Sequence, residues 1–207
     1  MRVLIACEES QTITMAFREL GHEAYSCDIQ DCSGGHPEWH IKGDALKEAY
    51  SGKYDLMIAH PPCTYLSNAG SCWLFRNKVI NKERYEKGLQ GKAFFLAMLN
   101  APVKHIAVEN PIPVRVFSLP EKSQIIHPYY FGDAESKATC LWLKNLPLLK
   151  HEKSDNLFNL ATHVKPNVYI SKNGNQTTFT EKFGGSKIRS KTFTGIAQAM
   201  AKQWGIL

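Results

Sequence analysis

The chain has 207 residues and a formal net charge of +6, with 43% hydrophobic and 21% charged residues. These values are typical of an ordinary soluble globular protein, so we expect a single domain with one full hydrophobic core over residues 1–207. No stretch approaches the ~20 apolar residues of a membrane-spanning helix, and we expect no membrane partner. Polar residues from Cys7 onward interrupt the apolar N-terminus too early for a signal peptide, so we expect a cytoplasmic protein with reduced cysteines.

The first part of the chain predicts a strand, a helix and a second strand. Residues 2–6, which are apolar from Val3 onward, predict the first strand. Apolar side chains at helical spacing over Thr12–Leu20 predict a helix that Gly21 ends. The second strand covers Glu23–Cys27 and closes at Asp28. A connection this short between strand and strand permits only a right-handed crossover.

The alternation continues through the middle of the chain. An irregular segment over residues 30–39 is followed by His40–Lys42, by Gly43-Asp44 and by a short helix over residues 45–50. Residues 54–59, which are apolar except for Asp55, are predicted to form a buried strand.

Beyond that strand we expect a loop, the longest helix and another strand. The loop covers residues 68–77 and should lie over the crevice at the end of the sheet. The helix covers residues 83–99, and residues 105–108 form the strand. The residues expected on the buried face of the helix are Leu89, Ala93, Leu96, Ala97 and Leu99.

The last third of the chain completes the prediction of fold. Residues 124–131 and 138–143 are expected to form an antiparallel pair at the edge of the sheet, and residues 192–204 a closing helix. Residues 150–187 are polar with little periodicity and predict a surface excursion. Strands that alternate with helices predict an α/β fold with a doubly wound, mostly parallel sheet and an antiparallel edge.

Reactive side chains stand at the predicted strand ends. Four successive strands end on an acid or a thiol, namely Asp28, Asp44, Cys63 and Glu109, and in a doubly wound sheet these ends share one edge. The Pro61-Pro62 pair cannot continue a sheet ladder, so the chain must turn sharply at Cys63. We therefore expect a ligand crevice at this edge with Cys63 in it.

These residue types point to a particular chemistry. A cysteine nucleophile needs a partner that handles protons, and Glu109 is the candidate, with partial burial expected to raise its pKa. A thiolate beside a carboxylic acid, without a clear histidine base, suits addition to an electron-poor ring rather than proteolysis. Asp28 is placed to bind ribose hydroxyls of a nucleoside cofactor, and Asp44 to bind the amine of its adenine.

The order of motifs resembles that of the C5-cytosine DNA methyltransferases. Pro61-Pro62-Cys63 and Glu109-Asn110 resemble the two central motifs of that family, and residues 4–28 resemble its first strand, helix and acidic second-strand end. Gly43-Asp44 is similar to the third motif, and Thr194-Gly195-Ile196-Ala197 is loosely similar to the last. The likeness is greatest to short members of the bacteriophage type, which lack a large target-recognition domain.

The resemblance implies a Rossmann-like class I fold and a mechanism that uses S-adenosyl-L-methionine. Cys63 would add to C6 of a cytosine flipped out of DNA, and Glu109 would contact N3 and the exocyclic amine before C5 takes the methyl group. The implied residues are, for catalysis, Cys63, Glu109, Pro62 and Asn110; for the cofactor, Cys7, Glu8, Ser10, Asp28, Ile29, Asp44, Ala45 and Pro61; and for the substrate, Ser67, Arg115, Lys137 and Arg189.

Three departures from the family pattern are visible. The loop over residues 7–11 has none of the expected glycines, and Lys137 stands where the family has an Arg-x-Arg pair, with Arg115 or Arg189 as a second cation. Residues 150–187 are too few for the usual recognition domain, which predicts low specificity, a partner, or a simpler substrate. The basic end after Lys182 favours contact with phosphate or forms a solvated face.

Several alternatives follow from these departures. The same chemistry would serve a free cytosine nucleotide or a single strand, and a different carbon unit is a further possibility. A second class of function is a catalytically weak protein that binds nucleic acid or a partner with the same fold. A run of possible zinc ligands is present but has an uncommon spacing, and we expect no metal; its members are Cys27, Cys32, His36 and His40. The sequence leaves the oligomeric state and the target sequence open.

Overall fold

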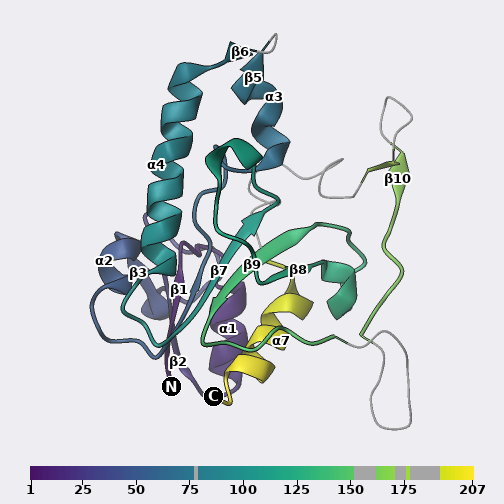
Figure 1. Cartoon of the computed structure of the whole chain (residues 1–207). Helices are drawn as coiled ribbons and strands as arrows, with labels where there is room; N and C mark the ends of the chain where they lie inside the picture. The colour runs from purple at the N-terminus through teal and green to yellow at the C-terminus, as the bar shows by residue number, and fades with distance from the viewer. Residues whose placement is uncertain (77–78, 152–161, 171–175, 178–191) are drawn as a thin grey trace.

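The computed structural model of this chain describes residues 1–76, 79–151, 162–170, 176–177 and 192–207. Its centre is a seven-stranded sheet with the strand order β3-β2-β1-β4-β7-β9-β8 (Figure 1). The strands are β1 (Arg2–Ala6), β2 (Glu23–Asp28), β3 (His40–Lys42), β4 (Leu56–Ala59), β7 (His105–Pro111), β8 (Gln124–Ile126) and β9 (Thr139–Lys144).

The directions of the strands confirm the predicted fold class. The five strands from β3 to β7 are parallel to their neighbours, whereas β9 runs antiparallel to both β7 and β8. The β8–β9 pair is therefore the predicted antiparallel edge. The predicted strand over residues 124–131 is shorter than expected, because Pro128 starts a 3-10 turn, Pro128–Phe131, and cannot donate to a ladder.

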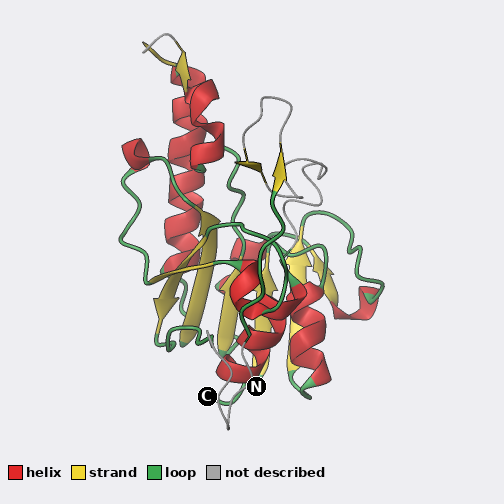
Figure 2. Ribbon diagram, turned by 90° about the vertical axis from the view of Figure 1, so that its right-hand side faces the viewer, coloured by secondary structure: helices red, strands yellow, loops and turns green. Residues whose placement is uncertain are grey.

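Helices cover both faces of the sheet (Figure 2). The helices α1 (Thr12–Glu19) and α7 (Thr194–Trp204) pack on one face with Val3 and Ile5 of β1. The helices α2 (Ala45–Ala49) and α4 (Lys82–Leu99) share the core of the other face with Leu4. Successive side chains of a strand alternate between faces, and this alternation builds two cores from one apolar run.

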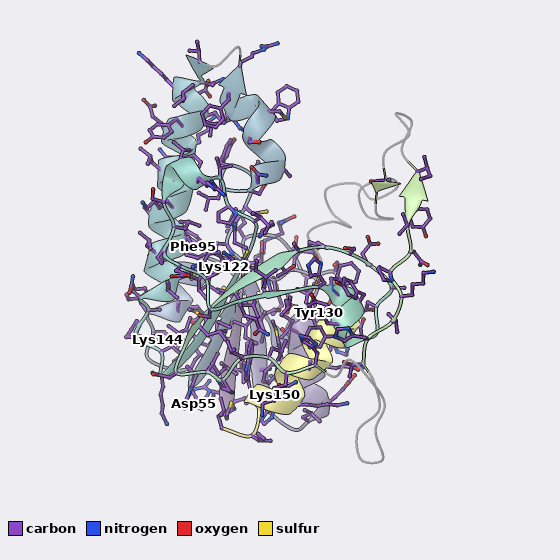
Figure 3. All side chains as sticks on the ribbon, turned by 45° about the vertical axis from the view of Figure 1, so that its right-hand side comes forward. Asp55, Phe95, Lys122, Tyr130, Lys144 and Lys150 are labelled. Carbon is purple, nitrogen blue, oxygen red and sulfur yellow. The ribbon has the colours of Figure 1, made fainter. Side chains whose placement is uncertain are left out.

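The buried face of α4 was predicted only in part, because Leu96 and Leu99 pack against the core as expected but Leu89 does not. Leu89 is 44% exposed, whereas Phe95 and Met98 are fully buried. The reason is that only the C-terminal half of α4 lies on the sheet, while its N-terminal half projects beyond it (Figure 1). Phe95, labelled in Figure 3, packs edge-on against Trp142 of β9, with ring centroids 4.9 Å apart.

The predicted loop over residues 68–77 also contains more structure than expected. A 3-10 turn, Asn68–Gly70, leads into the short helix α3 (Ser71–Leu74), and β5 (Phe75–Arg76) pairs with β6 (Val79–Ile80). These elements lie beside the projecting end of α4 (Figure 1). In the predicted excursion, β10 (Tyr169–Ile170) and β11 (Gln176–Thr177) form a small antiparallel pair, and residues 152–161, 171–175 and 178–191 lie outside the described residues.

No helix among the described residues combines the length and the apolar character that crossing a membrane requires.

Gly88 marks the point where α4 meets the segment after β7. A Cβ atom at this position would lie 2.1 Å from Cζ of Phe117, whose side chain is buried. We expect Gly88→Ala to lower the stability by about 1–2 kcal/mol, because overpacking of about 1–3 kcal/mol exceeds the helix propensity gained from alanine. Gly91→Ala is the matched control, since its Cβ would be 3.4 Å from Leu66, and it should melt at or above the wild-type temperature. Equal melting of Gly88→Ala and wild type would contradict this packing.

Candidate active site at the carboxyl edge of the sheet

The carboxyl ends of the parallel strands bring the predicted cofactor residues together. Burial raises the pKa of the Cys7 thiol to about 12, and the nearby charges of Asp28 and Asp44 add to this effect. The two carboxylates therefore share one neighbourhood at the ends of β1, β2 and β3. The backbone joins them too, because the N–H of Gly43 donates to the carbonyl of Asp28 over 2.9 Å.

Each of these acidic residues also shapes the backbone beside it. An oxygen of Asp28 accepts from the N–H of Gln30 over 2.9 Å, and the next residue, Ile29, is 78% exposed. Asp44 caps α2, with its carboxylate accepting from the N–H of Leu46 over 2.9 Å, and Ala45 is buried behind it. An exposed aliphatic side chain thus follows the Asp28 carboxylate at this edge of the sheet.

The loop after β1 keeps a left-handed backbone without glycine. Cys7 has a φ of 61° and Gln11 a φ of 59°, in a region that glycine adopts most easily. The Gln11 side chain compensates for this strain, because it donates to the carbonyl of His36 over 2.7 Å and accepts from its N–H over 3.0 Å. The conformations that the missing glycines would favour are thus present, held by a bond to the segment before β3.

Glu8 is buried at the start of α1. Its carboxylate accepts from the N–H of Ile13 and from the hydroxyl of Thr14, both over 2.7 Å, and the residue is only 4% exposed. Burial raises the pKa of Glu8, although the charge of His60 and these hydrogen bonds act in the opposite direction. The carboxylate therefore satisfies the free N–H groups of the helix. Ser10, also buried, accepts from Thr12 over 3.2 Å between the two hydroxyl oxygens.

The turn at Cys63 is closed by its own backbone. The carbonyl of Cys63 accepts from the N–H groups of Leu66 and Ser67, over 3.0 and 2.9 Å. Pro61 is buried and Pro62 is exposed, so the turn begins inside the protein and emerges at the motif. Cys63 itself is half-buried.

The segments after the two central motifs are bonded to each other. The N–H of Asn68 donates to the carbonyl of Ile112 over 2.7 Å, and the N–H of Val114 donates to the carbonyl of Leu66 over 2.8 Å. Ser67, the predicted substrate residue, forms a bridge with Pro113. These bonds tie the turn that carries Cys63 to the strand end that carries Glu109.

His60 is the site residue that the sequence prediction missed. Its Nδ1 donates to Oε2 of Glu109 over 2.7 Å, and the two side chains are only 12% and 15% exposed. The signal was present in the strand register, because Ala59 pairs with Val108 and the next residues are His60 and Glu109. A histidine before the Pro-Pro pair therefore had to lie beside the acid on the neighbouring strand.

This contact overturns the expected charge of Glu109. Burial acts to raise the pKa of Glu109, as predicted, but the hydrogen bond from His60 and the charges of His60 and Lys137 bring it below its ordinary value. The carboxylate is thus ionised at neutral pH. The expectation of a raised pKa was wrong because it considered only the apolar neighbours.

A small cavity lies beside the His60–Glu109 pair. Its volume is about 10 Å³, roughly the space of one water molecule. Its lining residues are His60, Glu109, Lys137, Thr139, Thr192, Phe193, Ile196 and Met200. Within the described part of the chain, Nε2 of His60 and Oδ1 of Asn110 are buried and have no hydrogen-bond partner. The predicted cation Lys137 therefore shares a cavity with the predicted acid.

The remaining predicted residues are placed differently. Arg115 is exposed at the start of a 3-10 turn, Arg115–Phe117, after the Glu109 strand. Arg189 lies outside the described residues. Gly195, in the loosely matched last motif, donates its N–H to Asp133 over 2.9 Å, and a Cβ there would lie 2.0 Å from the carbonyl oxygen of Phe131. This glycine seats the start of α7 against the turn before β9.

The residues of the possible zinc run make other contacts. The His36 ring stacks on Trp39 with centroids 4.0 Å apart, and the ring nitrogens of His40 contact Ser26 and the carbonyl of Gln30. Among the described residues, no group of three or more His, Cys, Asp or Glu side chains could hold a metal ion.

Comparisons with known proteins give a likeness in structure only. No model of a protein family matches the chain, and no curated protein matches its sequence. The methyltransferase EhMeth of Entamoeba histolytica matches with a TM-score of 0.47 and 17% identity, over 84% of this chain and 61% of that one. The Dnmt2 methyltransferase of S. pombe matches with a TM-score of 0.43 and 17% identity, over 71% of this chain and 50% of that one. The chain thus spans between half and about three fifths of these proteins, and at such scores neither likeness carries an argument about its function.

Proposed function

We propose that this protein transfers a methyl group from S-adenosyl-L-methionine to C5 of cytosine in DNA, through a covalent bond between Cys63 and C6. The observation that supports this best is the joined pair of motif segments. Cys63 stands on a turn that is bonded to the segment after Glu109, and Glu109 is ionised and oriented by His60. A thiol and an oriented carboxylate at one sheet edge suit addition to a pyrimidine ring.

The cofactor-binding residues would be those at the ends of β1, β2 and β3. Asp28 would accept hydrogen bonds from ribose hydroxyls, Asp44 would face the adenine amine, and Ile29 would cover the base. The left-handed backbone at Cys7 and the buried turn at Pro61 would line the donor end. When bound, S-adenosyl-L-methionine supplies an electrophilic methyl group.

The chain's own groups would carry the addition and the release. As the Cys63 sulfur, as a thiolate, bonds to C6, the electrons of the C5–C6 double bond move into the ring, and N3 takes a proton from water beside the Glu109 carboxylate. The ionised carboxylate of Glu109 also accepts a hydrogen bond from the exocyclic amine of the cytosine. After C5 is methylated, its proton leaves to water, the electrons left behind restore the C5–C6 double bond, and the sulfur leaves C6 as a thiolate. N3 returns its proton to water, so Cys63 and Glu109 end the cycle in the states in which they began.

Trapping with 5-fluorocytosine tests this proposal. Fluorine at C5 cannot leave as a proton, so the enzyme should remain bonded to the base through Cys63. We expect a mass increase equal to the oligonucleotide plus one methyl group, located by peptide mapping at Cys63. The adduct should require S-adenosyl-L-methionine, and the exposed thiol of Cys72 is the internal control because it should carry none. Methylation of unmodified DNA without an adduct at Cys63 would exclude this mechanism.

A further inference from the structure

The elements after Cys63 form an arm that projects from the body of the protein. The arm consists of residues 65–76 and 79–92, which include α3, the β5–β6 pair and the first half of α4 (Figure 1). In Figure 2 it stands beyond the end of the sheet, on the side where the strand ends carry the candidate site. Apart from the predicted substrate residue Ser67, its side chains have no role in the chemistry described above.

The arm carries an unusual share of exposed aromatic and basic side chains. Trp73 is 67% exposed, whereas Trp142 and Trp204 are almost fully buried. Phe75 is 40% exposed on the next element. Between residues 65 and 92 the sequence has six Lys or Arg and two Glu, a net charge of +4 against +6 for the whole chain. An aromatic surface with this charge complements a nucleic acid strand.

A groove of about 220 Å³ lies on this surface. It is lined by Tyr65, Trp73, Asn81, Glu83, Arg84 and Lys87. Cations lie over one of the rings, because the guanidinium carbon of Arg84 is 4.9 Å and the ammonium of Lys87 is 5.8 Å from the centroid of Tyr65. Glu83 at the groove is paired with Lys87 over 2.7 Å, so its charge is offset.

The groove is connected directly to the turn that carries the nucleophile. Arg84 donates to the carbonyl of Thr64 over 2.9 Å, and Thr64 and Tyr65 are the two residues after Cys63. The groove and the nucleophile therefore belong to adjoining residues of one segment. A base can stack on Trp73 only if its face is free, which a base within a duplex does not offer.

We propose that this arm binds an unpaired stretch of DNA beside the target cytosine, with one base stacked on Trp73. This inference rests on the proposed function and makes it more specific, since it names single-stranded DNA as the substrate. The arm would take the place of the recognition domain that the chain is too short to hold. Stacking and phosphate contact are tolerant of sequence, so the target sequence would be weakly specified.

Binding of a fluorescent single-stranded oligonucleotide to the Cys63→Ser protein tests the proposal without turnover. We expect Trp73→Ala to weaken binding by roughly 5- to 100-fold, the usual effect of losing one base–aromatic stack. Trp73→Phe should keep most of the affinity, because phenylalanine retains a stacking face. The circular dichroism spectrum and the melting temperature of each variant must match those of the Cys63→Ser protein. Unchanged affinity in Trp73→Ala would overturn the proposal, and so would equal losses for the duplex of the same sequence.

A matched pair of charge variants separates the arm from general attraction. Arg76→Gln with Lys87→Gln removes two charges from the arm, and Lys47→Gln with Lys202→Gln removes two from exposed positions on α2 and α7. The first pair should reduce the slope of the logarithm of the binding constant against the logarithm of the salt concentration by about 1–2. The second pair should leave this slope unchanged. Equal changes of slope in the two double variants would contradict a binding surface on the arm. Single-strand binding without a 5-fluorocytosine adduct would reject the proposed reaction and leave the arm's role standing.

Discussion

Cys63→Ser should lose methyl transfer by at least ~10³-fold, the scale seen when a nucleophile is removed from a covalent mechanism. A serine hydroxyl at this position lacks the thiolate that adds to C6. The side chain is half-buried on a turn closed by backbone bonds to Leu66 and Ser67, so the fold should be retained. Transfer of tritium from labelled S-adenosyl-L-methionine to DNA measures the loss.

Two controls make the result interpretable. Calorimetry should show nearly unchanged affinity of Cys63→Ser for S-adenosyl-L-methionine, because most of the cofactor residues lie at other strand ends and the substitution leaves the backbone at Pro61 in place. Cys72→Ser, at an exposed position on α3, should keep full activity. Turnover by Cys63→Ser close to that of wild type would mean that another group attacks the base.

His60→Gln should move the acidic limb of the pH–activity profile to higher pH. Glutamine keeps a hydrogen-bond donor toward Glu109 but carries no charge. With the charge gone, the burial that raises the pKa of Glu109 is less opposed, so the carboxylate ionises only at a higher pH. Activity at neutral pH should fall by roughly 100-fold, the lower end of the usual contribution of general acid–base groups.

The pH profile distinguishes this effect from a loss of structure. A purely structural role of His60 would lower activity equally at all pH values and would leave the limb in place. Glu109→Gln is the companion variant, since it removes the titrating group, and its residual activity should show no acidic limb from this pair. An unshifted limb in His60→Gln, at normal melting temperature, would refute the coupling.

The fold was predictable because most of its elements follow local rules. The apolar run at residues 3–6 became the part of β1 that is buried on both faces, and Gly21 ended α1 in a left-handed conformation, at a φ of 80°. The face of α4 was not predictable, because the helix leaves the sheet halfway along. Leu89 has the right spacing for a core position, but at this height the helix turns Gly88 and Gly91 toward Phe117 and Leu66 and leaves Leu89 44% exposed.

The candidate site was predictable in its chemistry but not in its electrostatics. Asp28, Asp44 and Glu109 were expected at one edge, and the shared influence of Asp28 and Asp44 on Cys7 agrees with that expectation. The charge of Glu109 depends on His60, 49 residues away in sequence, and this contact follows only from the register of two strands. Local composition carries no information about such a pair.

The loop after β1 has a consequence for how proteins of this kind are identified. Cys7 and Gln11 adopt the left-handed conformation at a cost of about 1–2 kcal/mol each for a non-glycine residue. The hydrogen bonds between the Gln11 side chain and the His36 backbone offset part of this cost. Two hydrogen bonds to a distant residue thus take the place of the conformational freedom of glycine. A sequence motif that requires glycine at these positions would therefore miss a loop with the same backbone conformation. Backbone geometry, together with the residue that secures it from outside, is the property to compare across distant relatives.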